Sequence, residues 1–338
     1  MSDIVDFISR LPKAELHLHL EGTITPATLV ELSSRHDSQR MTLAEAESYY
    51  SFSDFTGFIE GFKAVTRRLT DPEDYELVAW RMIEHLAEQG VVHAEVYISV
   101  GVIYMWRNFD PHCLEPIFAA LERSRERAQH ELGLSLYWIF DAVRHFTVEE
   151  AERVFRKAAE MRGYYPSIVG IGLGGDERVA GSEPFRYLYD EARLAGLRLT
   201  NHAGETTGPD AIWEALSVGT ERIGHALSAI RDQALVEELK SRGIALELNP
   251  TSNVRTGVCP SFASHPLRQY FDAGLLVTLN SDDPAFFDSD LANEYLRAHT
   301  EQGFSREELR RLAANSIRAS FLPEQEKAAW LSRIDSIR

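Results

Sequence analysis

Short apolar segments alternate with longer amphipathic stretches along most of the chain. The first lies within residues 14–22, and seven more follow at residues 91–98, 134–140, 168–173, 197–202, 222–226, 244–248 and 275–279. The amphipathic stretches between them begin at signals such as the capping box Thr147-Val148-Glu149-Glu150 and end at glycines such as Gly163. Eight strands that alternate with helices predict a parallel sheet closed into a (β/α)8 barrel, the TIM-barrel fold of the α/β class.

Additional helices are predicted after the first strand and at the C-terminus. The first group is an insertion of about residues 26–89, in which Pro26 can open one helix and Thr70-Asp71-Pro72 can cap another. Such an insertion either forms a lid over a site at the barrel mouth or packs on the flank of the barrel. The second group begins at the box Ser305-Arg306-Glu307-Glu308 and is expected to be two helices broken near Pro323. We expect one domain over residues 1–338.

The reactive side chains of the chain gather at the ends of the predicted strands. In a barrel of this kind the active site lies where the strands end and the following loops begin. The groups at these positions are His17 and His19, Gly174-Gly175-Asp176-Glu177, His202-Ala203-Gly204-Glu205, His225, Asn249-Pro250-Thr251-Ser252-Asn253 and Asn280-Ser281-Asp282-Asp283-Pro284. We therefore expect them to converge on one mouth.

Part of this set is typical of a zinc site. Residues i and i+2 of an extended strand point to the same face, so His17 and His19 project side by side. Three histidines and a carboxylate can hold one zinc ion and leave a position open for water. A lone buried histidine is more often a core residue, but four of the twelve histidines fall here at strand ends beside carboxylates. The predicted ligands of one Zn²⁺ per chain are His17, His19, His202 and Asp282.

Other metal arrangements fit the sequence less well. A carbamylated lysine that bridges two metals is disfavoured, because all five lysines lie off the predicted C-terminal strand ends. The H-x-E and P-C-x-x-C signature of another class of zinc deaminases fails, because Cys113 and Cys259 are far apart. The remaining histidines in polar surroundings are interpreted as surface residues; they are His36, His112, His130 and His299.

Catalysis at such a site needs groups that hold and move protons. Zinc lowers the pKa of a water molecule and makes it a nucleophile, provided that a neighbouring base accepts the proton. His225 is the candidate base, and Glu205 is expected to stay protonated in a partly apolar site and to donate to the substrate. Asp283 can accept a hydrogen bond from a protonated ring nitrogen or orient the water. Asp282-Asp283-Pro284 is also a common turn at the start of a helix.

Composition limits the partners of this site. A formal charge of −17 and a pI near 5.2 repel nucleic-acid backbones and anionic lipid, so a nucleotide-like ligand would be small and held in a pocket. Two cysteines exclude a disulfide framework. The start Met1-Ser2-Asp3-Ile4-Val5-Asp6 lacks the regions of a signal peptide, and no apolar run could span a bilayer. We expect a cytoplasmic protein that binds neither nucleic acid nor membrane.

Four motifs together resemble the adenosine/adenine deaminase family of the amidohydrolase superfamily. They are His17-Leu18-His19, His202-Ala203-Gly204-Glu205, Gly224-His225 and Ser281-Asp282-Asp283-Pro284, and the resemblance covers essentially the whole chain. It implies zinc on the four ligands named above, Glu205 protonating purine N1 as hydroxide adds to C6, and His225 orienting and deprotonating the water. Asp283 would hold N7 and the backbone N–H of Gly175 would reach N3. Ammonia leaves, and the 6-amino group becomes a 6-oxo group.

The substrate is less narrowly defined by the resemblance. Adenosine deaminases often have Asp where this chain has Glu21, and adenine deaminases typically continue with Glu-Gly where it has Thr206-Thr207-Gly208-Pro209. Residues 140–146 and 251–257 resemble instead the aminodeoxyfutalosine deaminases of the alternative menaquinone route. The expected reaction is the conversion of 6-aminodeoxyfutalosine to futalosine. Adenosine and adenine are alternative substrates.

Two arginines and two further residues are candidates for substrate binding. The benzoate carboxylate of aminodeoxyfutalosine suits a cationic fork, and Arg144 and Arg255 follow the third and seventh predicted strands. We predict that one of them contacts this carboxylate, although each could equally pair with the acidic surface. His19 and Glu21 are predicted substrate contacts on the first strand.

Two other function classes were weighed against deamination. A non-catalytic purine-binding relative would keep the barrel, but it would need neither Glu205 nor His225. A mononuclear hydrolase of amides or esters is less consistent with the position of Glu205. The sequence therefore favours an aminopurine deaminase.

Overall fold

Eight parallel β-strands form the centre of the computed structural model, which describes residues 2–337. They pair in chain order, so each strand lies beside its sequence neighbours. The strands are β1 (Lys13–His19), β2 (Val91–Ile98), β3 (Ser135–Val143), β4 (Ile168–Gly174), β5 (Arg198–Ala203), β6 (Arg222–His225), β7 (Ala245–Leu248) and β8 (Leu276–Leu279).

The sheet closes between β1 and the segment that follows β8. Leu18 forms a parallel bridge with Asp282. The amide of His19 donates to the carbonyl oxygen of Asp282 at 2.9 Å, and the amide of Asp282 donates to that of His17 at 3.0 Å. The predicted (β/α)8 barrel is confirmed, and its seam passes through three of the predicted metal ligands.

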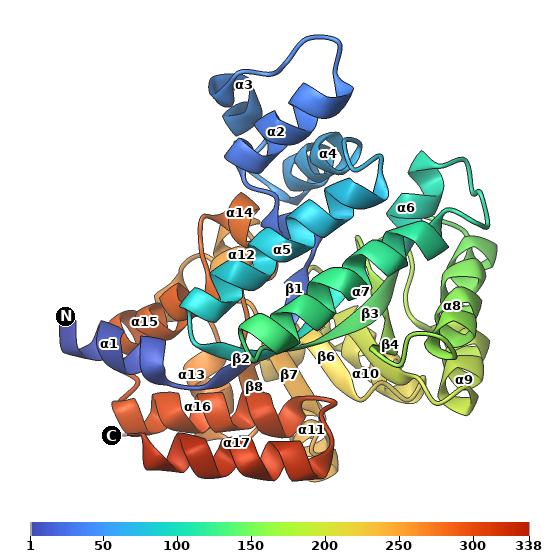
Figure 1. The fold of residues 1–338 in the computed structure, drawn as a ribbon. Helices are drawn as coiled ribbons and strands as arrows, with labels where there is room; N and C mark the ends of the chain where they lie inside the picture. Colours follow the sequence, from blue (N-terminus) through green and yellow to red (C-terminus); the bar gives the residue numbers. More distant parts are fainter. Residues whose placement is uncertain (1, 338) are drawn as a thin grey trace.

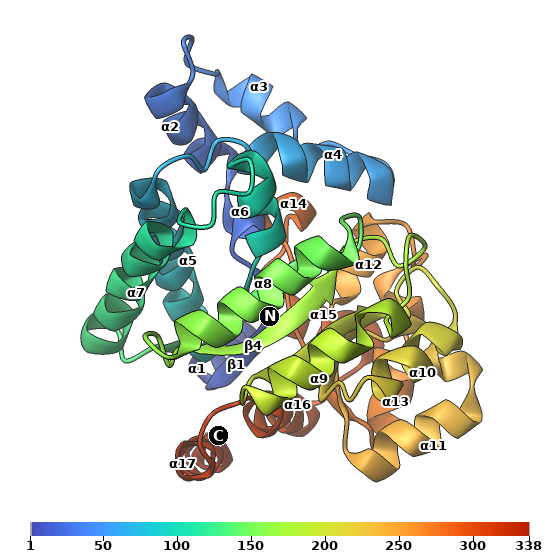
Figure 2. The same cartoon turned by 90° about the vertical axis from the view of Figure 1, so that its right-hand side faces the viewer.

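Helices surround the barrel on its outside (Figures 1 and 2). The longer connections are α7 (Leu114–Glu131), α8 (Val148–Arg162), α9 (Arg186–Leu194), α10 (Pro209–Ser217), α11 (Gln233–Arg242) and α13 (Leu267–Asp272). Shorter elements in the loops are η1 (Glu21–Thr23), α6 (Val100–Trp106), η2 (Glu183–Phe185), η3 (Leu227–Arg231), α12 (Pro250–Arg255), η4 (Phe262–Ser264) and α14 (Pro284–Phe287).

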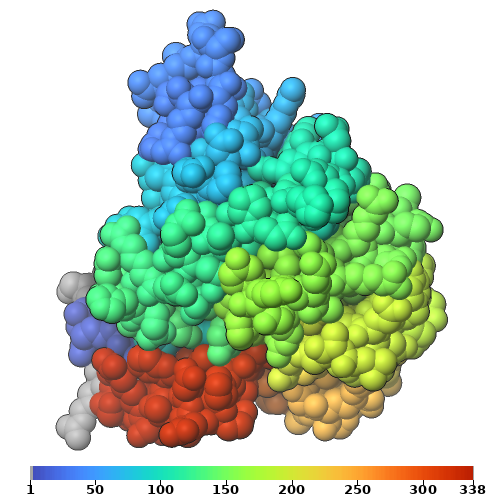
Figure 3. Space-filling model, turned by 45° about the vertical axis from the view of Figure 1, so that its right-hand side comes forward, coloured from blue at the N-terminus to red at the C-terminus, as the bar shows by residue number. Residues whose placement is uncertain are grey.

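Four helices make up the insertion after β1: α2 (Pro26–His36), α3 (Leu43–Ser48), α4 (Phe55–Thr66) and α5 (Pro72–Glu88). Of these, α2, α3 and α4 stand above the barrel, on the side opposite the C-terminal helices (Figures 1 and 3). In α4, Phe58 packs on Phe286 and Phe287 of α14, whereas α5 packs against α7. The two alternatives for the insertion therefore apply to different helices, because α4 covers the mouth and α5 covers the flank.

The C-terminal helices are α16 (Arg306–Ala319) and α17 (Glu324–Ser336), with Ser305 capping α16 as predicted. The sequence pattern predicts neither α1 (Ser2–Arg10) nor α15 (Leu291–Gln302), which are short helices beside the barrel. It also ends the third strand at residue 140, because Asp141 interrupts the apolar run. The backbone of Asp141 nevertheless pairs with Gly172, and β3 continues to Val143. Within residues 2–337, no helix is both long and apolar enough to cross a lipid bilayer.

Candidate active site

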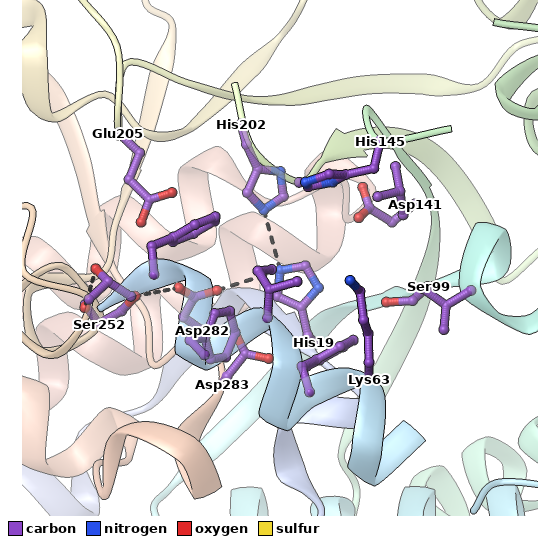
Figure 4. A pocket seen from close by; sticks show the side chains of 18 of the residues that line it. His19, Lys63, Ser99, Asp141, His145, His202, Glu205, Ser252, Asp282 and Asp283 are labelled. Carbon is purple, nitrogen blue, oxygen red and sulfur yellow. Dashed lines mark hydrogen bonds and ion pairs between the residues drawn. The ribbon is translucent and has the colours of Figure 1, made fainter. Parts of the chain in front are cut away.

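The predicted metal ligands meet at the carboxyl ends of β1, β5 and β8 (Figure 4). Nε2 of His19 lies 3.3 Å from Nε2 of His202 and 3.5 Å from Oδ1 of Asp282. Nε2 of His17 lies 3.4 Å from the same carboxylate oxygen. Segments far apart in the chain thus bring three ring nitrogens and one carboxylate to one small volume.

These residues fit a divalent metal ion. Nε2 of His17 is buried without a hydrogen-bond partner among residues 2–337. Burial lowers the pKa of His19 to about 4 and that of His202 well below its usual value, so both rings are neutral, as metal ligands must be. Burial opposes a charge on His17 as well, but the carboxylates of Asp282 and Glu247 raise its pKa to about 10. The site therefore favours a positive charge, which a metal ion would supply.

The backbone at the site adopts uncommon conformations. His225, Ala226 and Asp282 have φ angles of 64°, 49° and 66°, in the left-handed region. Each such residue costs roughly 1–3 kcal/mol and persists where the surrounding structure holds it. Here the turns direct the side chains of His225 and Asp282 into the barrel mouth.

A buried network of charges, which the sequence analysis did not identify, holds His17. Nδ1 of His17 lies 2.7 Å from Oε2 of Glu247 on β7. Tyr97 donates to the same oxygen at 3.1 Å, and Arg222 bridges Glu247 and Glu95. A carboxylate on the second ring nitrogen orients a metal-binding histidine. The available signal was the presence of Glu95, Arg222 and Glu247 inside otherwise apolar strands.

Glu205 lies beside the metal-binding point, and its side chain is buried. Burial raises its pKa well above the usual value, and the charges of Asp282 and Glu177 raise it further. Nδ2 of Asn253 lies 3.4 Å from its Oε1. The raised pKa favours the protonated form of this carboxyl group, which can donate a proton.

The loop that carries Glu205 is held by a second carboxylate. Glu177, which follows β4, accepts hydrogen bonds from the backbone amides of residues 204, 205 and 206 at 2.6, 2.7 and 3.0 Å. It also accepts one from the hydroxyl of Thr207 at 2.6 Å. Glu177 therefore positions the acid. The sequence analysis noted this residue at a strand end and gave it no role.

His225 is oriented by two amides. Nδ2 atoms of Asn249 and Asn253 lie 3.2 and 3.1 Å from its Nδ1, and its Nε2 faces Oδ2 of Asp282 at 4.0 Å. Burial lowers the pKa of His225 to about 3. The ring is therefore neutral at physiological pH.

Asp283 is buried next to the metal-binding point, and its Oδ1 has no hydrogen-bond partner among residues 2–337. Burial and the neighbouring charge of Asp282 raise its pKa well above the usual value. A Cβ on Gly22 would lie 2.1 Å from Oδ1 of Asp283, so only glycine leaves room for this carboxyl. The predicted catalytic groups Glu205, His225 and Asp283 thus surround the ligand set.

A cavity opens from this point toward α4 and α6. Of the predicted substrate contacts, His19, Gly175 and Asp283 line it. Gly175 has a φ of 86°, and a Cβ there would lie 2.9 Å from Nδ1 of His145. Glu21 is buried behind the lining, where its Oε1 accepts from the amide of Ser99 at 3.1 Å.

Asp141 is a lining residue that the sequence analysis did not single out. Its carboxyl is buried, makes no hydrogen bond within residues 2–337 and faces the cavity from the end of β3. Burial raises its pKa to about 8. A buried carboxyl without a protein partner is suited to a polar ligand group.

The structure brings neither Arg144 nor Arg255 to the cavity wall. Arg144 is buried, and its guanidinium donates to the carbonyl oxygens of Ala180 and His202 at 3.0 and 2.6 Å and to Oδ1 of Asn201 at 2.6 Å. These bonds leave it no free fork for a substrate carboxylate. Arg255 is exposed, and its guanidinium lies 5.6 Å from the ring centre of Phe52.

The four histidines that were predicted to lie on the surface fall into two groups. His112 and His130 are exposed, as expected. His36 and His299 are half-buried, which corrects the surface interpretation, because each has a partner in the fold. Nε2 of His36 lies 2.6 Å from Asp74, whose carboxylate accepts the amides of Thr70 and Asp71 at the start of α5.

Comparison with known proteins agrees with this geometry. The sequence profile of the family described as adenosine deaminase matches residues 12–337. This chain belongs to the adenosine deaminase family. It is 39% identical to the aminodeoxyfutalosine deaminase of Streptomyces avermitilis over 99% of this chain and 93% of that protein.

Two solved structures have the same fold. The adenine deaminase of Arthrobacter aurescens superposes with a TM-score of 0.89 at 31% identity, covering 96% of this chain and 98% of the other. A zinc-bound amidohydrolase of Burkholderia ambifaria superposes with a TM-score of 0.90 at 25% identity, covering 100% and 94%. The family enzymes are deaminases, hydrolases of the amidohydrolase superfamily.

Proposed function

We propose that this enzyme catalyses the zinc-dependent hydrolytic deamination of a 6-aminopurine nucleoside, with 6-aminodeoxyfutalosine as its small-molecule substrate. The products are futalosine and ammonia, and the step belongs to menaquinone biosynthesis. The relative from Streptomyces avermitilis, which is similar over nearly the whole chain, supports this substrate. The donor set of three histidines and one aspartate, together with the zinc in the structural neighbour, supports the metal.

The residues of the site suit the steps of this reaction. Bound zinc would be held by His17, His19, His202 and Asp282, where it lowers the pKa of a water molecule. Protonated Glu205 donates to N1 of the purine, and neutral His225 accepts the proton of the water that adds to C6. Protonated His225 then gives its proton to the amino group, the C6–N bond breaks and ammonia leaves, and the proton of the C6 hydroxyl returns to Glu205.

Two further groups fix the orientation of the purine in this proposal. Because its pKa is raised, the carboxyl of Asp283 keeps its proton and can donate to N7. The backbone N–H of Gly175, at the cavity wall, is available to N3. Glu205, Asp283 and the backbone of Gly175 would together contact three ring nitrogens of the purine: N1, N7 and N3.

The observation that favours a nucleoside over a free base as the substrate is that the cavity continues beyond the metal-binding point. Next to His19 the wall holds the unpartnered carboxyl of Asp141, which can accept a hydrogen bond from a sugar hydroxyl. Beyond it the wall is made by aromatic side chains, among them Phe58, Phe62 and Phe146. A second aromatic ring on the substrate would bury apolar surface there.

Adenine is the second candidate substrate, because the adenine deaminase of Arthrobacter aurescens shares the fold at 31% identity. A free adenine would leave Asp141 and the aromatic wall without contacts. The deciding experiment is the loss of ultraviolet absorbance and the release of ammonia with 6-aminodeoxyfutalosine, adenosine and adenine. We expect the highest kcat/KM with 6-aminodeoxyfutalosine. A higher value with adenine would contradict the proposal.

A further inference from the structure

One cationic side chain lines a cavity whose outer wall is otherwise mainly aromatic and apolar. Lys63 extends from α4, and Figure 4 shows its side chain directed toward the space between His19 and Ser99. Within the described part of the chain, Lys63 is the only lysine or arginine that lines this cavity. Its aromatic neighbours in the lining are Phe55, Phe58, Phe62 and Phe146.

The protein itself provides only a weak partner for this amine. Nζ of Lys63 lies 3.0 Å from Oε1 of Glu60, one turn earlier on the same helix. The side chain of Glu60 is 69% exposed and that of Lys63 is 49% exposed, and such surface pairs contribute little. The amine is therefore free to exchange this partner for an anion in the cavity. In a chain of net charge −17, a cation on a cavity wall is an unusual placement.

A second donor faces the same part of the cavity from the other side. His145 follows β3, lines the cavity and lies beside Gly175. Burial lowers the pKa of His145, the charge of Asp176 opposes this shift, and the charge of Lys63 adds to it. A neutral imidazole still donates one N–H, so an anion between the two residues would receive a charged and a neutral hydrogen bond.

We propose that Lys63 and His145 form a carboxylate-binding subsite that selects 6-aminopurine nucleosides with an anionic aromatic substituent over neutral ones. This inference rests on the proposed function and deepens it by naming the residues that recognise the distal group of the substrate. The phenylalanines beside Lys63 pack on the aryl ring, and the amine pairs with its carboxylate. This assignment takes over the role predicted for Arg144 and Arg255, because Arg144 is bound to buried acceptors and Arg255 does not line the cavity.

The subsite is tested by comparing two substrates that differ only in charge. Kinetic constants are measured for 6-aminodeoxyfutalosine and its benzamide analogue with the metal-loaded wild type, Lys63→Met, Lys63→Arg, His145→Ala and the control Glu60→Gln. We expect Lys63→Met to lower the ratio of the two kcat/KM values by roughly 10- to 100-fold, through KM, as for loss of a charged hydrogen bond.

The variants distinguish recognition from a structural role. Lys63→Arg should keep most of the preference for the carboxylate, and His145→Ala should lose part of it. Glu60→Gln removes only the surface partner and should leave the ratio at or above the wild-type value. An unchanged ratio in Lys63→Met, with both substrates slowed equally, would overturn the proposal.

A failure of the proposed function gives a different result. If the wild type deaminates adenine or adenosine but not 6-aminodeoxyfutalosine, the substrate assignment is wrong. The carboxylate and the benzamide are then compared as competitive inhibitors of the reaction that does occur. Lys63→Met must weaken inhibition by the carboxylate at least 10-fold more than inhibition by the benzamide. Equal inhibition constants of the two compounds in the wild type would overturn the subsite.

Discussion

Gly224 on β6 lies directly against the ring of His17, since a Cβ on Gly224 would be 2.6 Å from Cε1 and 3.0 Å from Nδ1 of that histidine. Gly224→Ala should displace the ring, break its contact with Glu247 and lower metal affinity by roughly 10- to 100-fold, as for loss of a supporting contact. Metal content after dialysis measures this effect. Gly163→Ala is the matched control, because Gly163 has helical φ and ψ and a Cβ there would make only an ordinary contact, 3.4 Å from the carbonyl oxygen of Glu160. Equal metal content in both variants would contradict the prediction.

Glu205→Gln should separate proton donation from metal binding. The amide has nearly the same shape as the carboxyl group and leaves the ligand set intact, but it cannot give a proton to N1. We expect kcat to fall by roughly 100- to 10,000-fold with unchanged metal content and thermal unfolding. Stopped deamination assays and metal analysis of the same preparation check both parts. Turnover near the wild-type rate would show that another group is the acid.

The pH dependence of the enzyme should follow the same residue. Burial raises the pKa of Glu205 in the folded enzyme, and only the protonated form donates. Activity is therefore present below the raised pKa and is lost as the pH rises through it. The profile of kcat/KM for the free enzyme should descend on the alkaline side. In Glu205→Gln the residual activity should lack this descent, and its persistence would assign the descent to another group.

Glu177→Gln should disturb the position of Glu205 and lower its pKa, because the charge of Glu177 helps to raise that pKa. One carboxylate oxygen accepts the amides of residues 205 and 206, and the other accepts the amide of residue 204 and the hydroxyl of Thr207. A glutamine must turn an NH2 group toward some of these donors. We expect kcat to fall by roughly 10-fold or more, with the alkaline descent kept but shifted. A wild-type kcat would show that the loop holds itself.

Arg144→Met should destabilise the protein and slow every substrate to the same extent. The change leaves two buried acceptors and one half-buried acceptor without their donor, at a cost on the order of 3 kcal/mol. It also frees the carbonyl oxygen of the metal ligand His202. Urea unfolding of the metal-loaded protein measures the destabilisation. The kcat/KM values for the carboxylate and benzamide substrates show whether both are slowed to the same extent. Selective loss on the carboxylated substrate would restore the original prediction for this arginine.

The sequence predicts the barrel and the ligand set because both depend on short regular spacings. His17 and His19 share a face by alternation, and each remaining ligand ends a strand of its own. The same alternation, continued one residue beyond the end of β3, accounts for the direction of the Arg144 side chain. Asp141 and Val143 line the cavity, so Arg144 points the other way, toward β5.

Other placements depend on features that the pattern does not reveal. Glu15 has the same parity as His17, yet it lines a groove with residues of α5 and α15 outside the barrel. The cause is a register shift between Glu15 and Leu18 in the pairing with β2. Lys63 lies off the predicted strand ends, so the sequence pattern does not place it at the barrel mouth. Only the packing of α4 across the mouth brings its side chain to the cavity wall.

Because Leu18 and Asp282 form the bridge that closes the barrel, a metal ion bound beside them would also stabilise this closure. Its ligands sit on the first strand and just after the last, so an ion bound there ties together two segments that are separated by most of the chain. Its binding energy then offsets part of the entropy of closing that long loop. Hydrogen exchange at the amides of His19 and Asp282 would show whether a bound ion keeps the barrel closed at this seam.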